Sequence, residues 1–191
     1  EGEAVLDDLA RHPSTARFLS EKLARHFVAD EPSERLIDEL AVTYIAADGE
    51  LAAVYSRLIE SADVWSAPLS KYKTPQDYIV SSYRAFNTAP ANPDRMLGFL
   101  DTLGQRPYTP GSPAGWPDTM AHWDGGDALL KRIDWASSVG QQISDRARPA
   151  ELGDAILGPV LSDHTRTAVT RAESPSQGLA LLLASPEFQR R

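Results

Sequence analysis

The chain has 191 residues, of which 42% are hydrophobic and 24% charged, and it contains no cysteine. This composition is typical of a globular protein of one or two domains, and it excludes disulfides, thiolate metal sites and cysteine nucleophiles. The net charge of −8 argues against nucleic-acid binding, which needs a basic face to displace counterions. No apolar run approaches the ~18 residues of a membrane span, so we expect no transmembrane segment.

Apolar residues recur with a helical period along nearly the whole chain. The first expected helix opens at residues 12–14, where Ser14 can cap the free amides or Pro13 can take the first helical position, and it carries apolar residues as far as Phe27. Further helices are expected, in chain order, over residues 36–45, 51–59, 74–86, 96–103, 128–143, 152–157, 162–172 and 178–184.

Capping residues support several of these boundaries. Thr74 and Ser162 stand where an N-cap is expected, and Gly104 stands where a helix C-terminus needs a left-handed residue. The inward face of the helix over residues 128–143 is expected to carry Leu129, Leu130, Ile133, Ala136, Val139 and Ile143. No long stretch alternates apolar and polar residues, so we predict a single compact all-α domain over residues 1–191, with about nine or ten helices.

Residues 105–127 depart from this helical pattern. Four prolines, at positions 107, 110, 113 and 117, forbid a continuous helix, and structureless segments of this length are usually either functional or disordered. Tyr108, Trp116 and Trp123 argue for order, because such aromatic side chains order a loop by burying their rings. We therefore predict a long, ordered loop rich in Pro, Gly and Trp.

Three interpretations of this loop remain open. It can cover the core, with Trp116 and Trp123 as plugs and Asp124 or Asp127 capping the next helix. It can be a recognition surface, on which aromatic faces stack against sugars or a partner's apolar side chains; its candidate binding residues are Tyr108, Trp116, Asp118, His122 and Trp123. It can also be a metal or catalytic site, because carboxylates and imidazole suit a divalent ion; its candidate ligands are Asp118, His122, Asp124 and Asp127.

The chain lacks the sequence motifs of the common enzyme classes. It contains no Gly-x-Ser-x-Gly elbow, no phosphate-binding loop and no His-Glu-x-x-His pair, so no nucleophile, nucleotide site or zinc site is indicated. The sequence therefore assigns no catalytic residue, no metal and no cofactor, and it leaves open whether the protein is an enzyme.

Four segments, in the same order along the chain, resemble a bacterial family catalogued as domain of unknown function 1800. The segments are His12-Pro13-Ser14-Thr15-Ala16-Arg17-Phe18-Leu19, Lys73-Thr74-Pro75-Gln76-Asp77-Tyr78, Leu103-Gly104-Gln105-Arg106-Pro107-Tyr108 with the following Gly115-Trp116-Pro117 and Trp123, and Leu182-Leu183-Ala184-Ser185-Pro186-Glu187-Phe188. The resemblance spans almost the whole chain. Relatives commonly carry Pro-Pro where this chain has Thr109-Pro110-Gly111.

The resemblance implies a cellular context rather than a reaction. Members are typically more than twice this length, so we expect this chain to be the C-terminal part of a longer protein. Many members carry export signals, and their genes often lie beside those of exported sulfatase-like proteins. The resemblance thus suggests a periplasmic or secreted protein whose partner is an exported sulfatase-like protein or an envelope polysaccharide.

Two functions follow as hypotheses. The first is a non-catalytic interaction or scaffold module that binds a protein partner or envelope polymer through the aromatic loop. The alternative is the C-terminal part of a hydrolase or metal-dependent enzyme whose main catalytic residues lie outside this chain, and to which Asp118, His122 or Asp124 would contribute.

Overall fold

The computed structural model of the protein describes residues 1–66, 69–90, 92–145 and 147–191. Over these residues the chain forms eleven α-helices and two short 3₁₀ helices, and its only β-type pairing is an isolated bridge between Tyr72 and Arg190. The prediction of an all-α fold is confirmed. No helix in the described ranges has both the length and the apolar character needed to cross a bilayer.

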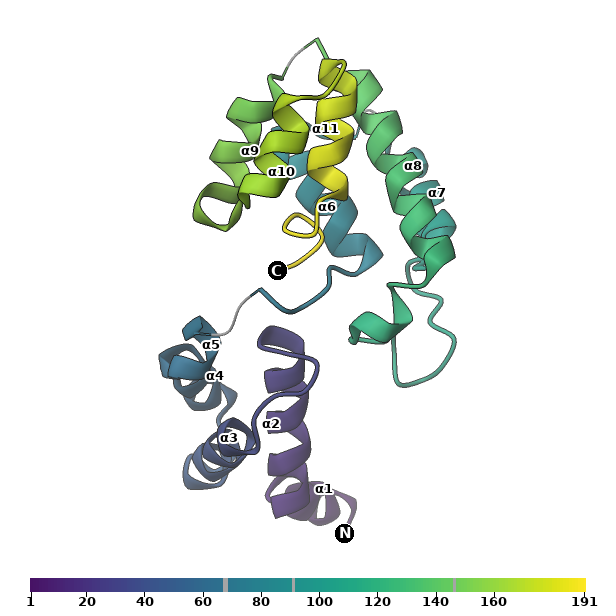
Figure 1. Ribbon diagram of the computed structural model, residues 1–191. Coiled ribbons are helices and arrows are strands. Elements are labelled where there is room, and N and C mark those ends of the chain that lie inside the picture. The colour runs from purple at the N-terminus through teal and green to yellow at the C-terminus, as the bar shows by residue number, and fades with distance from the viewer. Residues whose placement is uncertain (67–68, 91, 146) are drawn as a thin grey trace. The chain divides into compact units, whose positions relative to one another are not determined.

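The chain divides into two compact units, Glu1–Lys71 and Tyr72–Arg191, and each has its own buried core. The prediction that residues 1–191 form one domain stays a prediction. Figure 1 labels the helices of each unit.

The N-terminal unit consists of α1 (Gly2–Ala10), α2 (Pro13–Phe27), α3 (Glu34–Ala46), α4 (Leu51–Glu60) and α5 (Ala62–Ser66). The face of α2 that enters the core carries small residues, Ala16, Ser20 and Ala24, whereas Phe27 is exposed. Small side chains on α2 let α3 approach closely, and α3 supplies the bulk of the core through Leu36, Ile37, Leu40 and Tyr44.

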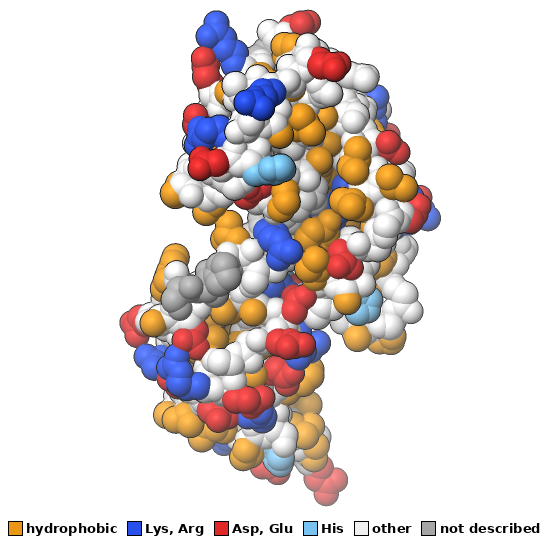
Figure 2. Space-filling view, in the orientation of Figure 1, with side chains coloured by type: hydrophobic (Ala, Val, Ile, Leu, Met, Phe, Trp, Pro, Cys, Tyr) orange, Lys and Arg blue, Asp and Glu red, His pale blue; other side chains and the backbone are white. Residues whose placement is uncertain are grey.

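Charged side chains of both signs gather on the surface of the N-terminal unit (Figure 2). Arg17 pairs with Glu34 and Asp38, and Arg35 pairs with Glu39 and Asp63. Because these pairs are solvent-exposed, each contributes little to stability. One further ion pair of this unit has a buried cation. Lys71 is only 2% exposed, and its Nζ lies 2.5 Å from Oδ1 of Asp30.

The C-terminal unit consists of α6 (Pro75–Ala85), α7 (Pro93–Thr102), α8 (Gly126–Ile143), α9 (Pro149–Leu157), α10 (Asp163–Thr170) and α11 (Pro175–Ala184), with 3₁₀ helices at Met120–His122 and Gly158–Val160. Its core joins side chains of α6, α7, α8 and α11 with Phe188 from the C-terminal segment. The Phe188 ring packs edge-on against Tyr78, at a centroid distance of 6.0 Å.

Three of the predicted caps are found in the structure, at Thr74, Ser162 and Gly104. The hydroxyls of Thr74 and Ser162 accept hydrogen bonds from the third residue of α6 and α10, and Gly104 has φ of +86° after the last turn of α7. At α2, Pro13 occupies the first helical position, but Nδ1 of His12, rather than Ser14, is the capping acceptor. The expectation that Asp124 or Asp127 caps α8 is wrong: neither side chain forms a cap hydrogen bond with any described residue, and Gly125 is the N-cap.

The inward face of α8 differs from the prediction. Leu129, Leu130 and Ile133 are exposed, whereas Arg132 and Trp135 are buried together with Ala136, Val139, Gly140 and Ile143. The reason is the close contact with α11, which runs alongside α8 (Figure 1). A Cβ atom on Gly140 would lie 2.5 Å from the carbonyl oxygen of Ser176, so only the glycine face of α8 can meet α11.

Candidate functional site

The segment 105–127 is anchored at its first residue. Gln105 is 7% exposed, and its Oε1 accepts a hydrogen bond of 2.8 Å from the backbone N–H of Gln76, in the first turn of α6. This bond satisfies one of the free amides at the N-terminus of α6. The start of the loop is therefore fixed to α6.

The two tryptophans of the loop differ in their environment. Trp123 is 6% exposed, and its Nε1–H donates to the carbonyl oxygen of Pro117 at 3.0 Å. Trp116 is half-buried and lies against Trp123, with ring centroids 6.2 Å apart. Trp123 thus orders the loop from inside, while part of the Trp116 ring remains available to a ligand.

His122 and the acidic residues of the loop do not form a metal site. Nδ1 of His122 lies 3.0 Å from the hydroxyl of Thr119, and Asp118 lies 3.9 Å from a guanidinium nitrogen of Arg191. Asp127 pairs with Lys131 one turn along α8. Nowhere in the described part of the chain do three His, Asp or Glu side chains come together as metal ligands, so the metal interpretation based on Asp118, His122, Asp124 and Asp127 is not supported.

Tyr108 and Trp116 border a groove of about 390 Å³. We call it the loop groove. Its wall is formed by α6, α7 and the first part of the loop, through Gln76, Ile79, Val80, Met96, Leu97, Leu100, Gln105, Pro107, Tyr108 and Trp116. Of the candidate residues Tyr108, Trp116, Asp118, His122 and Trp123, the structure brings only Tyr108 and Trp116 together here.

The loop groove is suited to binding rather than to acid–base chemistry. Among its described lining residues the polar side-chain groups are two amides, the Tyr108 hydroxyl and the indole N–H of Trp116. The amides belong to Gln76 and Gln105. The side chain of Tyr108 is fully exposed, and its backbone has φ of +62°, a region that costs a bulky L-residue ~1–2 kcal/mol. Backbone strain of this kind clusters at functional sites.

A second polar cluster holds the C-terminal segment in place. Arg132 is 1% exposed and donates hydrogen bonds of 2.7 Å to Oε1 of Gln189 and to the carbonyl oxygen of Lys73. Its guanidinium lies over the rings of Tyr72 and Tyr78, at 4.4 and 5.0 Å. Burial lowers the pKa of Arg132 from its usual value, because a buried cation loses hydration.

Burial shifts the neighbouring groups as well. The pKa of Lys73 falls to about 8, chiefly through desolvation, and its Nζ lies 4.1 Å from the centre of the Phe188 ring. Desolvation also raises the pKa of Tyr72 and of Tyr78. We assign this cluster a structural role, because Arg132 donates its hydrogen bonds to the backbone carbonyl of Lys73 and to the side chain of Gln189.

Sequence reasoning missed the apolar residues that complete the loop groove. Val80 and Leu97 are 40% and 44% exposed, so each is an apolar residue on the outer side of an amphipathic helix. The available signal in the α6 sequence was Val80, an apolar residue directly after Ile79, which belongs to the buried face of the helix. Their position beside Tyr108 follows only from the packing of α6 against α7.

Comparison with known proteins gives one finding. A family model described as "Protein of unknown function (DUF1800)" matches residues 1–190, which is nearly the whole chain. No curated protein and no solved structure gives a significant match. The chain therefore belongs to the DUF1800 family of proteins of unknown function.

Proposed function

We propose that the C-terminal unit is a non-catalytic interaction module and that the loop groove binds an extended, apolar segment of a partner protein. One observation carries this proposal: Tyr108 is completely exposed, on a strained backbone, at the edge of a groove whose wall already exposes Val80 and Leu97. Tyrosine and tryptophan are the side chains that most often dominate the energy of a protein interface.

The chemistry of the groove favours a protein segment over a polysaccharide. A sugar chain would bring many hydroxyl groups, each of which needs a hydrogen-bond partner when it leaves water. The side-chain amides in the described wall are Gln76 and Gln105, and the Gln105 oxygen is already bonded to the backbone of α6. Apolar side chains, in contrast, would contact the accessible apolar residues of the wall, Val80, Met96 and Leu97.

The family context suggests where the partner lies. We propose that the protein acts in the periplasm or outside the cell, and that the partner is an exported sulfatase-like protein encoded near it. An envelope polysaccharide is the competing ligand. Binding measurements with the purified sulfatase-like protein and with an envelope polysaccharide separate the two.

The test measures binding to the purified sulfatase-like protein. The 191-residue chain is immobilised, and the dissociation constant is determined by biolayer interferometry for the wild type and for Tyr108→Ala. Because Tyr108 is fully exposed, its removal should leave the fold intact, which circular dichroism verifies. Loss of an interface tyrosine should weaken binding by at least ~10-fold.

Tyr55→Ala is the matched control, since Tyr55 is an exposed tyrosine, 43% accessible, on α4 of the N-terminal unit. Its affinity should equal that of the wild type. The proposal is wrong if the purified protein does not bind, if both variants lose affinity equally, or if an envelope polysaccharide is retained instead and its retention depends on Tyr108.

A further inference from the structure

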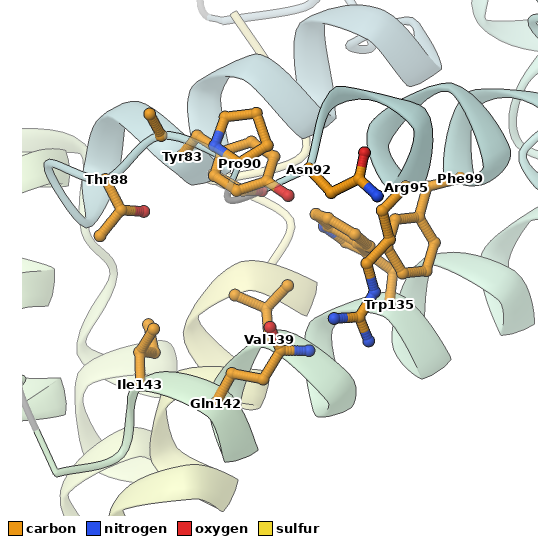
Figure 3. A pocket seen from close by; sticks show the side chains of 12 residues that line it. Tyr83, Thr88, Pro90, Asn92, Arg95, Phe99, Trp135, Val139, Gln142 and Ile143 are labelled. Atoms are coloured by element: carbon orange, nitrogen blue, oxygen red, sulfur yellow. The ribbon is translucent and has the colours of Figure 1, made fainter.

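A second cavity, of about 220 Å³, lies in the C-terminal unit and shares no lining residue with the loop groove. We call it the Trp135 pocket. Figure 3 shows its walls, which come from the end of α6, the segment before α7, α7 itself and α8. Phe99, Val139 and Ile143 give it an apolar side, and Arg95, Asn92 and Gln142 give it a polar side.

The indole of Trp135 is held rigidly at the inner wall. Its ring packs edge-on against Phe99 and Tyr83, at centroid distances of 4.2 and 5.9 Å, and Trp135 is only 4% exposed. Its Nε1–H has no hydrogen-bond partner among the described residues. Figure 3 shows the indole at the inner wall of the pocket, and its Nε1 is itself buried.

An unpartnered buried N–H is costly. Leaving a buried donor without an acceptor costs ~1–3 kcal/mol, and unpaired side-chain donors are uncommon in native structures. The edge of Trp135 borders a cavity large enough for a ligand. The missing acceptor is therefore expected to come from a molecule that occupies this cavity.

Three of the other polar groups of the pocket can donate hydrogen bonds, whereas Gln142 donates its NH₂ group to Ser138 and keeps its oxygen as an acceptor. Oδ1 of Asn92 accepts a hydrogen bond from the backbone N–H of Asp94, which leaves its NH₂ group to donate. Burial raises the pKa of Tyr83, so its hydroxyl keeps its proton at neutral pH. None of the ion pairs within the described ranges includes Arg95, and Figure 3 shows its side chain extending from α7 toward Gln142 on α8.

We propose that the Trp135 pocket binds a small organic carboxylate with an apolar body, whose carboxylate lies between the indole N–H of Trp135 and the guanidinium of Arg95. Guanidinium–carboxylate hydrogen bonds are among the strongest in proteins, and the apolar body would contact Phe99, Val139 and Ile143. The cavity exceeds the roughly 150 Å³ that admits benzene and is smaller than the roughly 300 Å³ of drug-sized sites.

The probe is phenylacetate, an aryl carboxylate of fitting size, added to the nitrogen-labelled 191-residue chain. The four tryptophans give four indole N–H signals in a nitrogen–proton correlation spectrum, and that of Trp135 is assigned through its proximity to Phe99. We expect this signal alone among the four to shift and to saturate, with a dissociation constant on the order of 1 mM.

Two comparisons test the role of charge. Arg95→Gln should weaken binding by ~10-fold or more, and neutral phenylacetamide should bind the wild type equally poorly. Arg95 is exposed, so this variant should fold normally. The control is Arg171→Gln, an exposed arginine outside the pocket, which should bind phenylacetate like the wild type.

The proposal fails if the Trp135 signal does not respond at about ten times the expected dissociation constant. It also fails if Arg95→Gln or the neutral amide binds as well as the reference pair, because the pocket would then not recognise a carboxylate. Binding through the loop groove is a separate property and would be unaffected by Arg95→Gln.

Discussion

Replacing Arg132 with Met tests whether one buried cation fastens the C-terminal segment to the core. Methionine fills similar space in the apolar part of the site but has no donor. The substitution leaves two acceptors, Oε1 of Gln189 and the carbonyl oxygen of Lys73, without the 2.7 Å hydrogen bonds they now accept. It also removes the contacts of the guanidinium with the rings of Tyr72 and Tyr78.

The size of the effect follows from these losses. Each orphaned buried acceptor costs ~1–3 kcal/mol, and the two ring contacts together add on the order of 1 kcal/mol. Part of this loss is offset because the variant no longer buries a charge, a penalty reflected in the lowered pKa of Arg132. We therefore expect the free energy of unfolding to fall by about 2–5 kcal/mol.

Urea denaturation followed by tryptophan fluorescence measures this change. With a slope of about 2 kcal/mol per molar urea, the midpoint should fall by roughly 1–2.5 M. The urea midpoint of Arg132→Lys should lie between those of the wild type and Arg132→Met, because a lysine keeps the charge but lacks the planar, forked donor group of arginine. The exposed Arg171→Met serves as control and should stay within about 0.5 kcal/mol of the wild type. A loss below about 1 kcal/mol for Arg132→Met would refute the reasoning.

Two further stability predictions follow. Unfolded Lys73 titrates near 10.5 and folded Lys73 near 8, so the unfolded chain binds more protons between these values. Between pH 8 and pH 10.5 the free energy of unfolding should therefore rise with pH, by up to ~1.4 kcal/mol per pH unit. Urea titrations at several pH values measure this rise, and Lys73→Met should abolish it. The same pH dependence in Lys73→Met and in the wild type would contradict this prediction. Gly140→Ala should lower the free energy of unfolding by ~1–3 kcal/mol, and with it the melting temperature, because the new Cβ atom would clash with the carbonyl oxygen of Ser176. Gly98→Ala, which meets no atom within 4 Å, should instead stabilise α7 by ~0.5–1 kcal/mol; equal effects would refute the packing argument.

The loop 105–127 shows how aromatic residues of one segment divide into different tasks. Trp123 is buried and bonded to Pro117, whereas Tyr108 is fully exposed. A sequence pattern treats both as order-promoting aromatics. Their difference is a property of the folded loop, in which Tyr108 also adopts a positive φ.

Much of the fold was determined by local sequence. Helix periods and capping residues fix an element because they act within a few residues of one another, without a tertiary partner. The starts of α6 and α10 at Thr74 and Ser162 are examples. Two helices, α1 and α5, escaped prediction; α1 has no buried residue, and α5 has five residues, too few for a clear period.

Which face of a helix is buried was decided only by the tertiary structure. On α8 the sequence offered Leu129, Leu130 and Ile133 for the core, yet the molecule buries Arg132 and Trp135 instead. An arginine can enter the core only where distant groups satisfy it, and its partners Gln189 and Lys73 lie 57 and 59 residues away along the chain. Local periodicity carries no information about such partners, so it cannot identify the buried cation, the loop groove or the Trp135 pocket.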